Sequence, residues 1–396
     1  MRGVEVERHK VVKQRNGRIC RPAPGVTVYV LAAVALLLLM STTAAMASNL
    51  STKASQVTPG TFVELTSMTG WDNGGILNPP GCSGGDVIAH FANKAVWNPI
   101  TKRFQFSGSP HNPCSGTNER AVYYDDAANS WGTLPTPPGS TNDPRHSYDH
   151  NTINPATGEH YYTYYGSNNL IRLSTDGGSW TTLAPRSGNF QCCRAQAWFP
   201  DMGGGRLIHY DGDWGLRAYN PATNSWAQLA SGNGSDGSGL PQLPAEPYEV
   251  FAHYSPLCQC VVFGGGVGFY KLNSNGTFTT LTKSGSPGGS FRIGPGGMSV
   301  VTEPVTGLLL FITGTTMWEF NPTGTGSWRT LSVSIPSFFT TAGSTGESLI
   351  STPVSTYGVI MYIKHDDIGT GRVFLYKHAP SSPQTTPSVP SRVTAQ

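Results

Sequence analysis

The chain has 396 residues, of which only 12% are charged, and it contains 48 glycines and 30 prolines. This composition favours many short strands joined by tight turns and argues against a helical bundle. The formal net charge of +3 is too small to indicate a basic nucleic-acid-binding protein.

Residues 1–47 are predicted to be a secretory signal peptide. A basic stretch precedes the apolar run Val26–Met40, and small residues ending in Ala45-Met46-Ala47 follow. The apolar run is short for a membrane span of about 20 residues, and an uncleaved anchor is the alternative. The segment holds seven Lys/Arg and two Asp/Glu, a net charge of +5, so the rest of the chain carries about −2. We therefore expect a secreted, extracellular or periplasmic protein with no membrane span after cleavage and no nucleic-acid partner.

A pattern of the form Ser-Trp-x-x-Leu recurs from residue 130 onward. Its aromatic position falls at 131, 180, 226, 278 and 328, in steps of 49, 46, 52 and 50 residues. A period near 50 residues with aromatic and glycine markers indicates one propeller blade per repeat. We expect its tryptophans to pack between blades rather than to bind ligand. These are Trp131, Trp180, Trp226 and Trp328.

A proline in a short turn marks the same units independently. The six prolines are Pro99, Pro155, Pro200, Pro256, Pro304 and Pro353. Because proline cannot donate a ladder hydrogen bond, each is expected in the turn between the first and second strands of a blade. The third strands are expected at residues 121–124, 170–173, 216–219, 269–272, 317–320 and 373–376.

The N-terminal strand is expected to complete the last blade. There are six proline turns and six third strands but only five Ser-Trp-x-x-Leu repeats, and residues 61–66 (TFVELT) match the pattern of residues 277–282 (TFTTLT). A strand added there removes an exposed sheet edge. The prediction is an all-β, six-bladed propeller of four-stranded antiparallel blades over residues 61–379. Residues 48–60 form a lead-in and residues 380–396 a flexible Pro/Ser/Thr-rich tail, and a monomer is expected.

The repeats resemble those of kelch-type propellers, including the central domain of galactose oxidase, over roughly residues 60–379. The resemblance implies the fold and leaves the function open.

Six cysteines remain after the signal segment, and an even number in an exported chain suggests disulfides. They are Cys82, Cys114, Cys192, Cys193, Cys258 and Cys260. A Cys82–Cys114 bond would join the first two long loops, and the adjacent Cys192 and Cys193 bond to each other or elsewhere. The sequence leaves the connectivity open.

Each unit is expected to run between two faces of a disc. The turn face carries the short turns, such as residues 99–102 and 155–158. The loop face carries the longer connections, such as residues 73–90, 141–150 and 188–194. Long loops of unusual composition on a rigid scaffold usually carry function, so we place the site on the loop face.

Four histidines are expected to converge on one sector of the loop face. His90 and His146 each stand nine residues before a turn proline, and His111 and His365 each stand twelve residues after one. Their blades, 6, 1 and 2, are neighbours in a closed ring. Histidine titrates or binds metal near neutral pH, although such residues also serve to hydrogen-bond loop backbones. Other polar residues of the region complete the candidate set: Arg145, Tyr148, His150, Asp366 and Asp367, with Arg194 in blade 3.

The first functional hypothesis is a recognition module that binds a polysaccharide or another extracellular ligand on the loop face. Sugar rings stack on aromatic side chains, and the region offers Tyr148, Phe190, Trp214 and Phe291. Contacts to the ligand are assigned to His150, Trp214 and His365.

The second hypothesis is a lyase that cleaves an acidic polysaccharide by β-elimination. Such a reaction needs a cation for the uronate carboxylate, a base and an acid for the leaving oxygen. Arg145 or Arg194 is the candidate cation, and Tyr148 the candidate acid. The candidate bases are His90, His111 and His146.

The arrangement is loosely similar to that of propeller ulvan lyases, in which two histidines about twenty residues apart act with a later Tyr and Arg. Here His90 and His111 are 21 residues apart. Those lyases have seven blades, and no later Tyr/Arg pair with matching spacing is found in this chain.

A copper radical oxidase is the least favoured hypothesis. Galactose oxidase has adjacent Tyr-His ligands, whereas the nearest segment here is Arg145-His146-Ser147, and a further domain that supplies the last histidine is missing from this sequence.

Neither the recognition module nor the lyase requires a cofactor, and either could hold a divalent cation, Ca²⁺ or Zn²⁺. Nitrogen and oxygen ligands are offered by His365-Asp366-Asp367 with His111, and oxygen ligands by Asp211-Gly212-Asp213. Carboxylates in such turns also act as plain turn formers.

Overall fold

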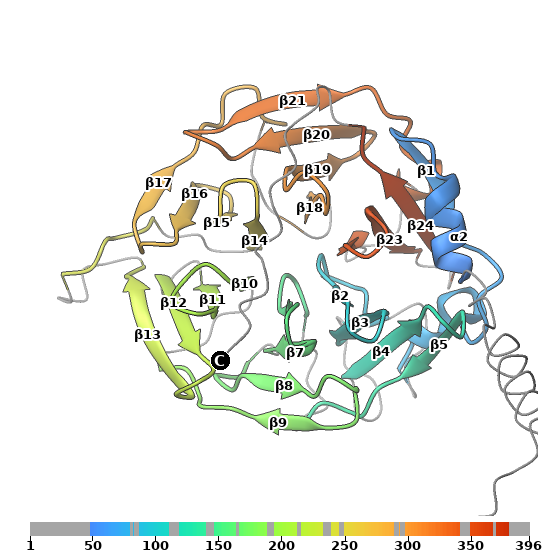
Figure 1. The fold of residues 1–396 in the computed structure, drawn as a ribbon, viewed down its shortest axis with the longest axis horizontal. Helices are drawn as coiled ribbons and strands as arrows, with labels where there is room; N and C mark the ends of the chain where they lie inside the picture. The colour runs from blue at the N-terminus through green and yellow to red at the C-terminus, as the bar shows by residue number, and fades with distance from the viewer. Residues whose placement is uncertain are drawn as a thin grey trace, which may run out of the picture. The chain divides into compact units, whose positions relative to one another are not determined.

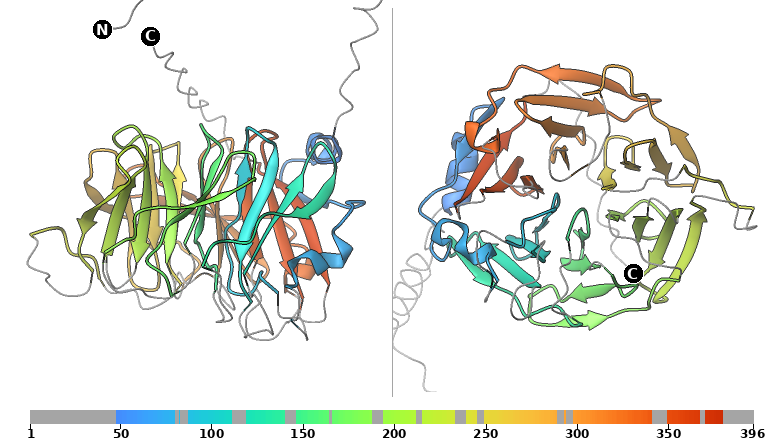
Figure 2. Two further views of the ribbon diagram at one scale, coloured as in Figure 1. Left: turned by 90° about the horizontal axis from the view of Figure 1, so that it is seen from below. Right: turned by 180° about the vertical axis from the view of Figure 1, so that it is seen from behind.

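The unit that begins at Ser48 is a six-bladed β-propeller (Figure 1). The structure, a computed structural model, describes residues 48–79, 82, 87–110, 119–139, 146–163, 166–187, 194–211, 215–232, 239–244, 249–288, 293, 298–340, 349–366 and 370–379. Within these residues the strands form six four-stranded antiparallel sheets around a central channel, and they run from one face of the disc to the other (Figure 2). The predicted fold class is confirmed.

The first three blades follow one another along the chain, each with its first strand innermost. Blade 1 contains β2 (Val96–Asn98), β3 (Arg103–Gly108), β4 (Arg120–Asp125) and β5 (Ser130–Thr133). Blade 2 contains β6 (Asn151–Asn154), β7 (Glu159–Tyr162), β8 (Ile171–Leu173) and β9 (Trp180–Thr182). Blade 3 contains β10 (Ala195–Phe199), β11 (Arg206–Asp211), β12 (Gly215–Asn220) and β13 (Ser225–Ala230).

The last three blades repeat this order, and the sixth takes its outer strand from the N-terminal part. Blade 4 contains β14 (Phe251–Ser255), β15 (Cys260–Gly264), β16 (Phe269–Asn273) and β17 (Phe278–Thr280). Blade 5 contains β18 (Ser299–Thr302), β19 (Leu309–Thr313), β20 (Thr316–Asn321) and β21 (Ser327–Leu331). Blade 6 contains β22 (Leu349–Val354), β23 (Val359–His365), β24 (Gly371–Lys377) and β1 (Thr61–Glu64).

The ring closes as the sequence predicts. Strand β1 pairs antiparallel with β24, and Phe62 stands opposite Tyr376. The Phe62 ring lies 4.6 Å from Tyr376, 5.4 Å from Phe339 and 5.7 Å from Tyr362 between ring centroids. The last blade is therefore held by aromatic packing as well as by backbone hydrogen bonds, and its third strand is not left as an open edge.

Phe62→Ala is expected to lower the free energy of unfolding by about 2–3 kcal/mol, because a partly buried aromatic ring loses three ring neighbours. Thr66→Ala, an exposed substitution just beyond β1, should change it by less than about 0.5 kcal/mol. Urea denaturation with the disulfides intact measures both. Equal effects would mean that the closing strand adds no stability.

The tryptophans of the repeated pattern link neighbouring blades. In three of them, the indole Nε1 donates a hydrogen bond to the backbone carbonyl of the residue that follows the leucine of the preceding repeat. These bonds join Trp180 to Pro135 (2.7 Å), Trp226 to Ala184 (2.9 Å) and Trp328 to Thr282 (2.8 Å). Trp131 Nε1 instead points to Met68 Sδ at 3.1 Å. The prediction that these residues pack between blades is confirmed, and it explains why tryptophan and leucine recur together.

The turns between first and second strands share a backbone conformation. One equivalent position in each has a positive φ: Lys102 (54°), Gly158 (74°), Gly203 (52°), Gln259 (50°), Gly307 (77°) and Gly358 (63°). In blade 3 the next two glycines have positive φ as well. In five blades the equivalent position comes three residues after the turn proline. In blade 6, Gly358 comes three positions after Ser355 and five after Pro353. Pro353 lies inside β22, opposite Ile360, so its prediction as a turn residue is wrong; the open edge of the innermost strand accommodates it.

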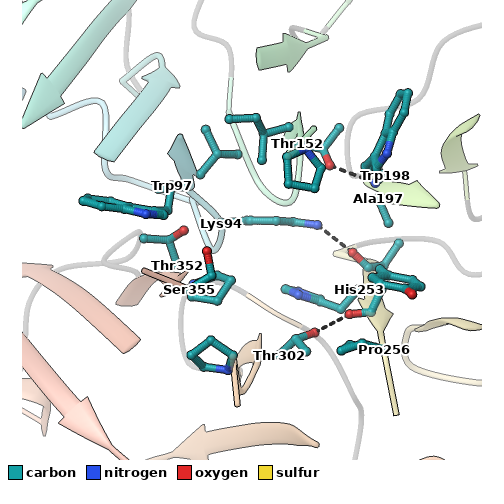
Figure 3. Close-up of a pocket in the computed structure, with 18 of the residues that line it drawn as sticks. Lys94, Trp97, Thr152, Ala197, Trp198, His253, Pro256, Thr302, Thr352 and Ser355 are labelled. Carbon is teal, nitrogen blue, oxygen red and sulfur yellow. Dashed lines mark hydrogen bonds between the residues drawn. The ribbon is translucent and has the colours of Figure 1, made fainter. Parts of the chain in front are cut away.

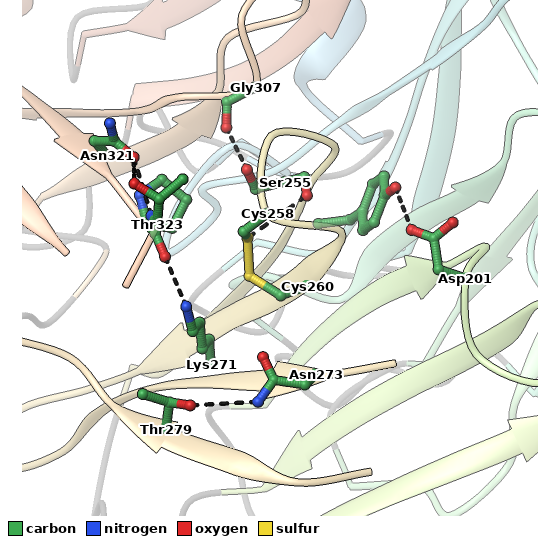
Figure 4. The surroundings of a disulfide bond; sticks show 12 residues. Asp201, Ser255, Cys258, Cys260, Lys271, Asn273, Thr279, Gly307, Asn321 and Thr323 are labelled. Carbon is green, nitrogen blue, oxygen red and sulfur yellow. Dashed lines mark hydrogen bonds between the residues drawn. A yellow bond between two sulfur atoms is a disulfide. The ribbon is translucent and has the colours of Figure 1, made fainter. Parts of the chain in front are cut away.

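A disulfide closes the corresponding turn of blade 4. Cys258 and Cys260 are bonded to each other across Gln259 (Figure 4). Ser255, at the end of β14, donates from Oγ to the Gly307 carbonyl of blade 5 at 2.5 Å, which ties this turn to the next one. Cys82 is also disulfide-bonded, and its partner lies outside the described residues, as do Cys114, Cys192 and Cys193.

The lead-in contains a short helix that the composition does not predict. Helix α2 (Asn49–Gln56) begins after Ser48, whose hydroxyl accepts from the Ser51 amide at 3.0 Å, a standard N-cap. Two short 3₁₀ segments also occur, η1 (Asp72–Leu77) and η2 (Ser337–Thr340). Within the described part of the chain, no helix has the length and apolar character needed to cross a bilayer.

Candidate functional site

A histidine and a tyrosine form a hydrogen-bonded pair at the loop-face end of blade 2. His146 Nδ1 lies 2.5 Å from the Tyr148 hydroxyl. The Phe91 ring of blade 1 stacks on the imidazole, with 4.2 Å between centroids and 11° between planes. Tyr148 is buried, whereas His146 is half-buried. The stacked phenyl ring and the hydroxyl fix the imidazole in one orientation at the protein surface.

The backbone beneath this pair is strained. Tyr148 has φ 29° and Phe91 has φ 50°, a region that bulky side chains rarely adopt. The Tyr148 amide donates to the Phe91 carbonyl at 2.7 Å, so the two unusual residues hold each other in place. Such conformations cost about 1–3 kcal/mol each and cluster at functional sites.

A cluster of buried charges lies between blades 2 and 3, at the same end of the strands. The arginine cluster consists of Arg186, Arg194 and Arg217 with the carboxylate of Asp211. Asp211 Oδ2 lies 2.9 Å from Arg186 Nη1 and 3.2 Å from Arg194 Nε, and Arg194 Nη1 donates to the Ser167 carbonyl at 2.7 Å. Burial, with the repulsion of Arg186 and Arg217, lowers the pKa of Arg194 to about 9 in spite of Asp211.

His150 connects the arginine cluster to the His146–Tyr148 pair. Its ring centroid lies 5.8 Å from that of Tyr148. Burial, followed by the positive charge of Arg194, lowers the pKa of His150 to about 3, and His146 adds to the effect. His150 is therefore a neutral imidazole at physiological pH. The structure thus brings together four of the predicted residues: His146, Tyr148, His150 and Arg194.

The other described candidates take part in packing and turns. His90 is buried in a turn next to Phe91, and its amide donates to the Val87 carbonyl. His365 ends β23 and is buried against η1, where a side chain on Gly74 would come within 2.9 Å of its Cδ2. Counted from Ser355 in place of Pro353, His365 stands ten residues after the turn position. It is therefore not the equivalent of His111, which corrects the predicted alignment.

Two of the predicted cation ligands, Asp366 and Asp211, lie in the described part of the chain, and both make other interactions there. Asp366 Oδ1 accepts from the Thr370 amide at 2.6 Å, and the Asp366 amide donates to the Thr370 carbonyl at 2.8 Å, so this carboxylate closes a turn. Asp211 is paired with two arginines. Three or more His, Cys, Asp or Glu side chains are not gathered as a metal site in the described residues. His111, Arg145, Trp214 and Asp367 lie outside those residues.

A buried ion pair closes the central channel, and sequence reasoning did not find it. Lys94 reaches from blade 1 across the channel (Figure 3). Its Nζ lies 2.6 Å from Asp149 Oδ2 of blade 2 and donates to the carbonyls of Gln196 (2.5 Å) and Ala252 (2.6 Å). Burial alone would raise the pKa of Asp149, but Lys94 and then His253 lower it to about 2. We call Lys94 and Asp149 the channel plug.

Comparisons with known proteins give this chain neither a family nor an activity. No family model and no curated protein matches the chain. Solved structures that it resembles include a protein of unknown function from Bacteroides thetaiotaomicron, with TM-score 0.45, 10% identity, and coverage of 82% of this chain and 73% of that one.

Two further solved structures resemble the chain with similar TM-scores and sequence identities. A fungal alcohol oxidase of the AA5 family, in complex with copper, has TM-score 0.42 and 11% identity over 76% of each chain. A nidogen–laminin complex has TM-score 0.42 and 12% identity, with coverage of 69% of this chain and 97% of that one. Matches this distant carry no argument about the chemistry or function of the chain.

Proposed function

We propose that this protein is an exported propeller that binds an acidic extracellular polysaccharide on its loop face, next to the His146–Tyr148 pair. The observation that carries the proposal is the arginine cluster, in which Arg186 and Arg194 share a single oxygen of Asp211. Among the described residues, this end of blades 2 and 3 gathers the guanidiniums of Arg186, Arg194 and Arg217 around the carboxylate of Asp211 and a neutral His150, and we infer a positive potential there. A ligand that bears carboxylate or sulfate groups is complementary to a positive potential.

The cluster acts through its field rather than by contact. Arg186 and Arg194 are both almost fully buried, with 3% and 1% of their surface exposed, so a polymer cannot touch them directly. Buried charges are screened by salt far less than exposed ones. A positive potential at the loop face therefore attracts an anionic chain, while the half-buried His146 offers a polar contact at the surface.

A lyase is the second candidate, and the 2.5 Å contact between His146 Nδ1 and Tyr148 Oη favours it. A base and an acid in direct hydrogen-bond contact suit β-elimination, in which the base removes the proton α to the uronate carboxylate. The C–O bond at the neighbouring carbon then breaks, a C=C bond forms, and the leaving oxygen takes a proton. The electropositive surroundings stabilise the negative charge that develops on the carboxylate.

His146→Ala is expected to weaken the binding of polygalacturonate at least about tenfold, because the variant loses the polar contact at the site. Isothermal titration of the mature protein with polygalacturonate, a sulfated galactan and a neutral glucan measures this, and added salt should weaken only the anionic ligands. Tyr357→Phe is the matched control, since the Tyr357 hydroxyl bonds Asp126 away from the site.

The ultraviolet absorbance of the same mixtures tests the lyase. If the absorbance of an unsaturated uronate grows with the wild-type protein and does not grow with Tyr148→Phe, the protein is a lyase. If this absorbance does not grow although the polymer still binds, the protein is a recognition module. Equal affinity for the neutral and anionic polymers, or unchanged binding in His146→Ala, would refute the proposal.

A further inference from the structure

The disulfide of blade 4 joins two cysteines that are separated by a single residue. Cys258 and Cys260 are bonded across Gln259, in the turn between β14 and β15 on the turn face (Figure 4). In the chain-entropy description, a disulfide stabilises a fold by closing a loop of the unfolded chain, and the contribution shrinks with the length of that loop. This bond therefore adds less to stability than a disulfide that closes a long loop.

The turn itself does not depend on the disulfide. Gln259 has φ 50°, and the equivalent residues Lys102 of blade 1 and Gly307 of blade 5 have φ 54° and 77°. In blade 1 the positions of the two cysteines are taken by Thr101 and Arg103, which cannot be bonded to each other. The backbone conformation is therefore a property of the blade, and we expect it to persist when the S–S bond is opened.

A reduced Cys258 has a hydrogen-bond acceptor already in place. Its Sγ lies 3.7 Å from the carbonyl oxygen of Ser255, and a thiol at this position donates a weak hydrogen bond to it. The disulfide sulfur carries no proton and makes no such bond. Cys260 is held independently of its sulfur, because its backbone pairs with Ser255 on one side and with Asn273 on the other. The same turn thus accommodates the oxidised and the reduced form.

The two sulfur atoms differ in access and in their surroundings. Cys258 is half-buried, whereas Cys260 is fully buried, so a thiolate from solution reaches Cys258 first. Lys271 leaves the same face of blade 4 as Cys260, because Cys260 pairs with Asn273, two residues further along β16. Its ammonium donates to two backbone carbonyls of blade 5. A cation on this face favours a thiolate at Cys260 and offsets part of the cost of burying it.

We propose that Cys258 and Cys260 form a thiol-exchange site, at which a low-molecular-weight thiol such as glutathione reversibly reduces the disulfide while the propeller stays folded. The thiolate attacks Cys258 Sγ, a new S–S bond forms, and the bond to Cys260 breaks. The electron pair leaves on Cys260 Sγ, which then takes a proton.

A second thiolate completes the exchange. It attacks the glutathione sulfur of the mixed disulfide and releases Cys258, which is protonated in turn. Two thiols are thus oxidised to one disulfide, and the protein gains two electrons and two protons. The reverse sequence reoxidises the protein. This site lies on the turn face, away from the His146–Tyr148 pair, so it stands or falls independently of polysaccharide binding.

Equilibration of the mature protein with glutathione tests the proposal. In about 10 mM reduced and about 0.1 mM oxidised glutathione at neutral pH, at least about half of the Cys258–Cys260 pairs should be reduced, whereas a disulfide with the potential of a structural bond stays oxidised. Rapid alkylation followed by peptide mass spectrometry counts these two cysteines separately from the others. The near-ultraviolet circular dichroism of the reduced protein should match that of the oxidised protein.

Two single-cysteine variants show which sulfur is attacked. In Cys260→Ala, the remaining Cys258 should take up one glutathionyl group from oxidised glutathione. In Cys258→Ala, the buried Cys260 should react at least about tenfold more slowly. Equal rates in the two variants would overturn the assignment of Cys258 as the attacked residue.

The double variant Cys258→Ala/Cys260→Ala measures what the bond adds to stability. It should lower the urea midpoint by no more than about 0.5 M, because the closed loop is short. The proposal is wrong if the pair stays oxidised in the glutathione buffer or if its reduction unfolds the protein. A much larger loss of stability in the double variant would make the bond a structural one.

Discussion

Asp149→Asn is expected to lower the free energy of unfolding by about 3–5 kcal/mol, the cost of leaving one member of a buried ion pair uncompensated. Asp149 is fully buried, and its Oδ2 lies 2.6 Å from Lys94 Nζ and accepts from the Ala252 amide at 2.9 Å. Its Oδ1 accepts from Asn93 Nδ2 at 2.7 Å. The carboxylate thus joins blades 1, 2 and 4 at the centre of the ring. Urea denaturation followed by circular dichroism measures the loss.

Two further variants test whether the loss of stability comes from the unpaired charge of Lys94 or would follow from the loss of any carboxylate. Asp125→Asn breaks the more exposed pair with Arg103 (2.8 Å) and should cost about 1 kcal/mol. The double variant Lys94→Met/Asp149→Asn should be more stable than Asp149→Asn alone, because no charge then remains in the channel. If Asp149→Asn costs no more than Asp125→Asn, the channel plug does not hold the blades together.

The fold could be predicted because each blade repeats the same local requirement. The indole of Trp226, for example, bonds the carbonyl after Leu183, so a tryptophan in one repeat needs a leucine-containing turn in the previous one. Because this hydrogen bond recurs from blade to blade, the residues that make it recur in the sequence at a regular spacing. The closing strand followed from the same rule, since Phe62 occupies the aromatic position of the pattern opposite Tyr376.

The blade 6 turn was misplaced because proline is only an indirect marker of that turn. What the turn needs is a residue with positive φ, and Lys102 and Gln259 fill that position without being glycine. Their side chains conceal the pattern that the backbone obeys. Once Gly358 is taken as the marker, Ser355 replaces Pro353 and the histidine alignment of blade 6 changes with it.

Three members of the candidate site could be predicted to lie together because they are close in sequence, and Arg194 was predicted without its partners. His146, Tyr148 and His150 precede one strand, so their proximity follows from local geometry. The pairing of Arg194 with Asp211 depends on which side chains of β10 and β11 face the interior, and periodicity alone does not give this.

A pocket at the turn-face end of the central channel was also missed, because each blade contributes only three or four residues to it. A signal was nevertheless present: Trp97 and Trp198 both stand two positions before a turn proline. Both residues belong to innermost strands, and those strands converge on the axis.

Stability is expected to fall steeply in mild acid, by up to about 1.4 kcal/mol per pH unit for each buried histidine between about pH 6.5 and pH 3. Burial lowers the pKa of both His150 and His160 to about 3, and those of His209 and His253 are also lowered. Below pH 6.5 the unfolded chain binds protons that the folded chain does not. Acid therefore favours unfolding, and the stabilisation is complete only above the unfolded-state pKa.

The variant His160→Gln measures the contribution of one buried histidine to this pH dependence, at a position that belongs to no proposed site. His160 is fully buried, and its Nε2 lies 2.9 Å from Asn151 Oδ1, a contact that the glutamine amide can retain. The variant should reduce the slope of unfolding free energy against pH by about 1.4 kcal/mol per unit between pH 6 and pH 4, while Thr66→Ala leaves the slope unchanged. Urea titrations across that range decide the point. An unaltered slope in His160→Gln would mean that this imidazole is protonated inside the fold, which would require a counter-charge beside it.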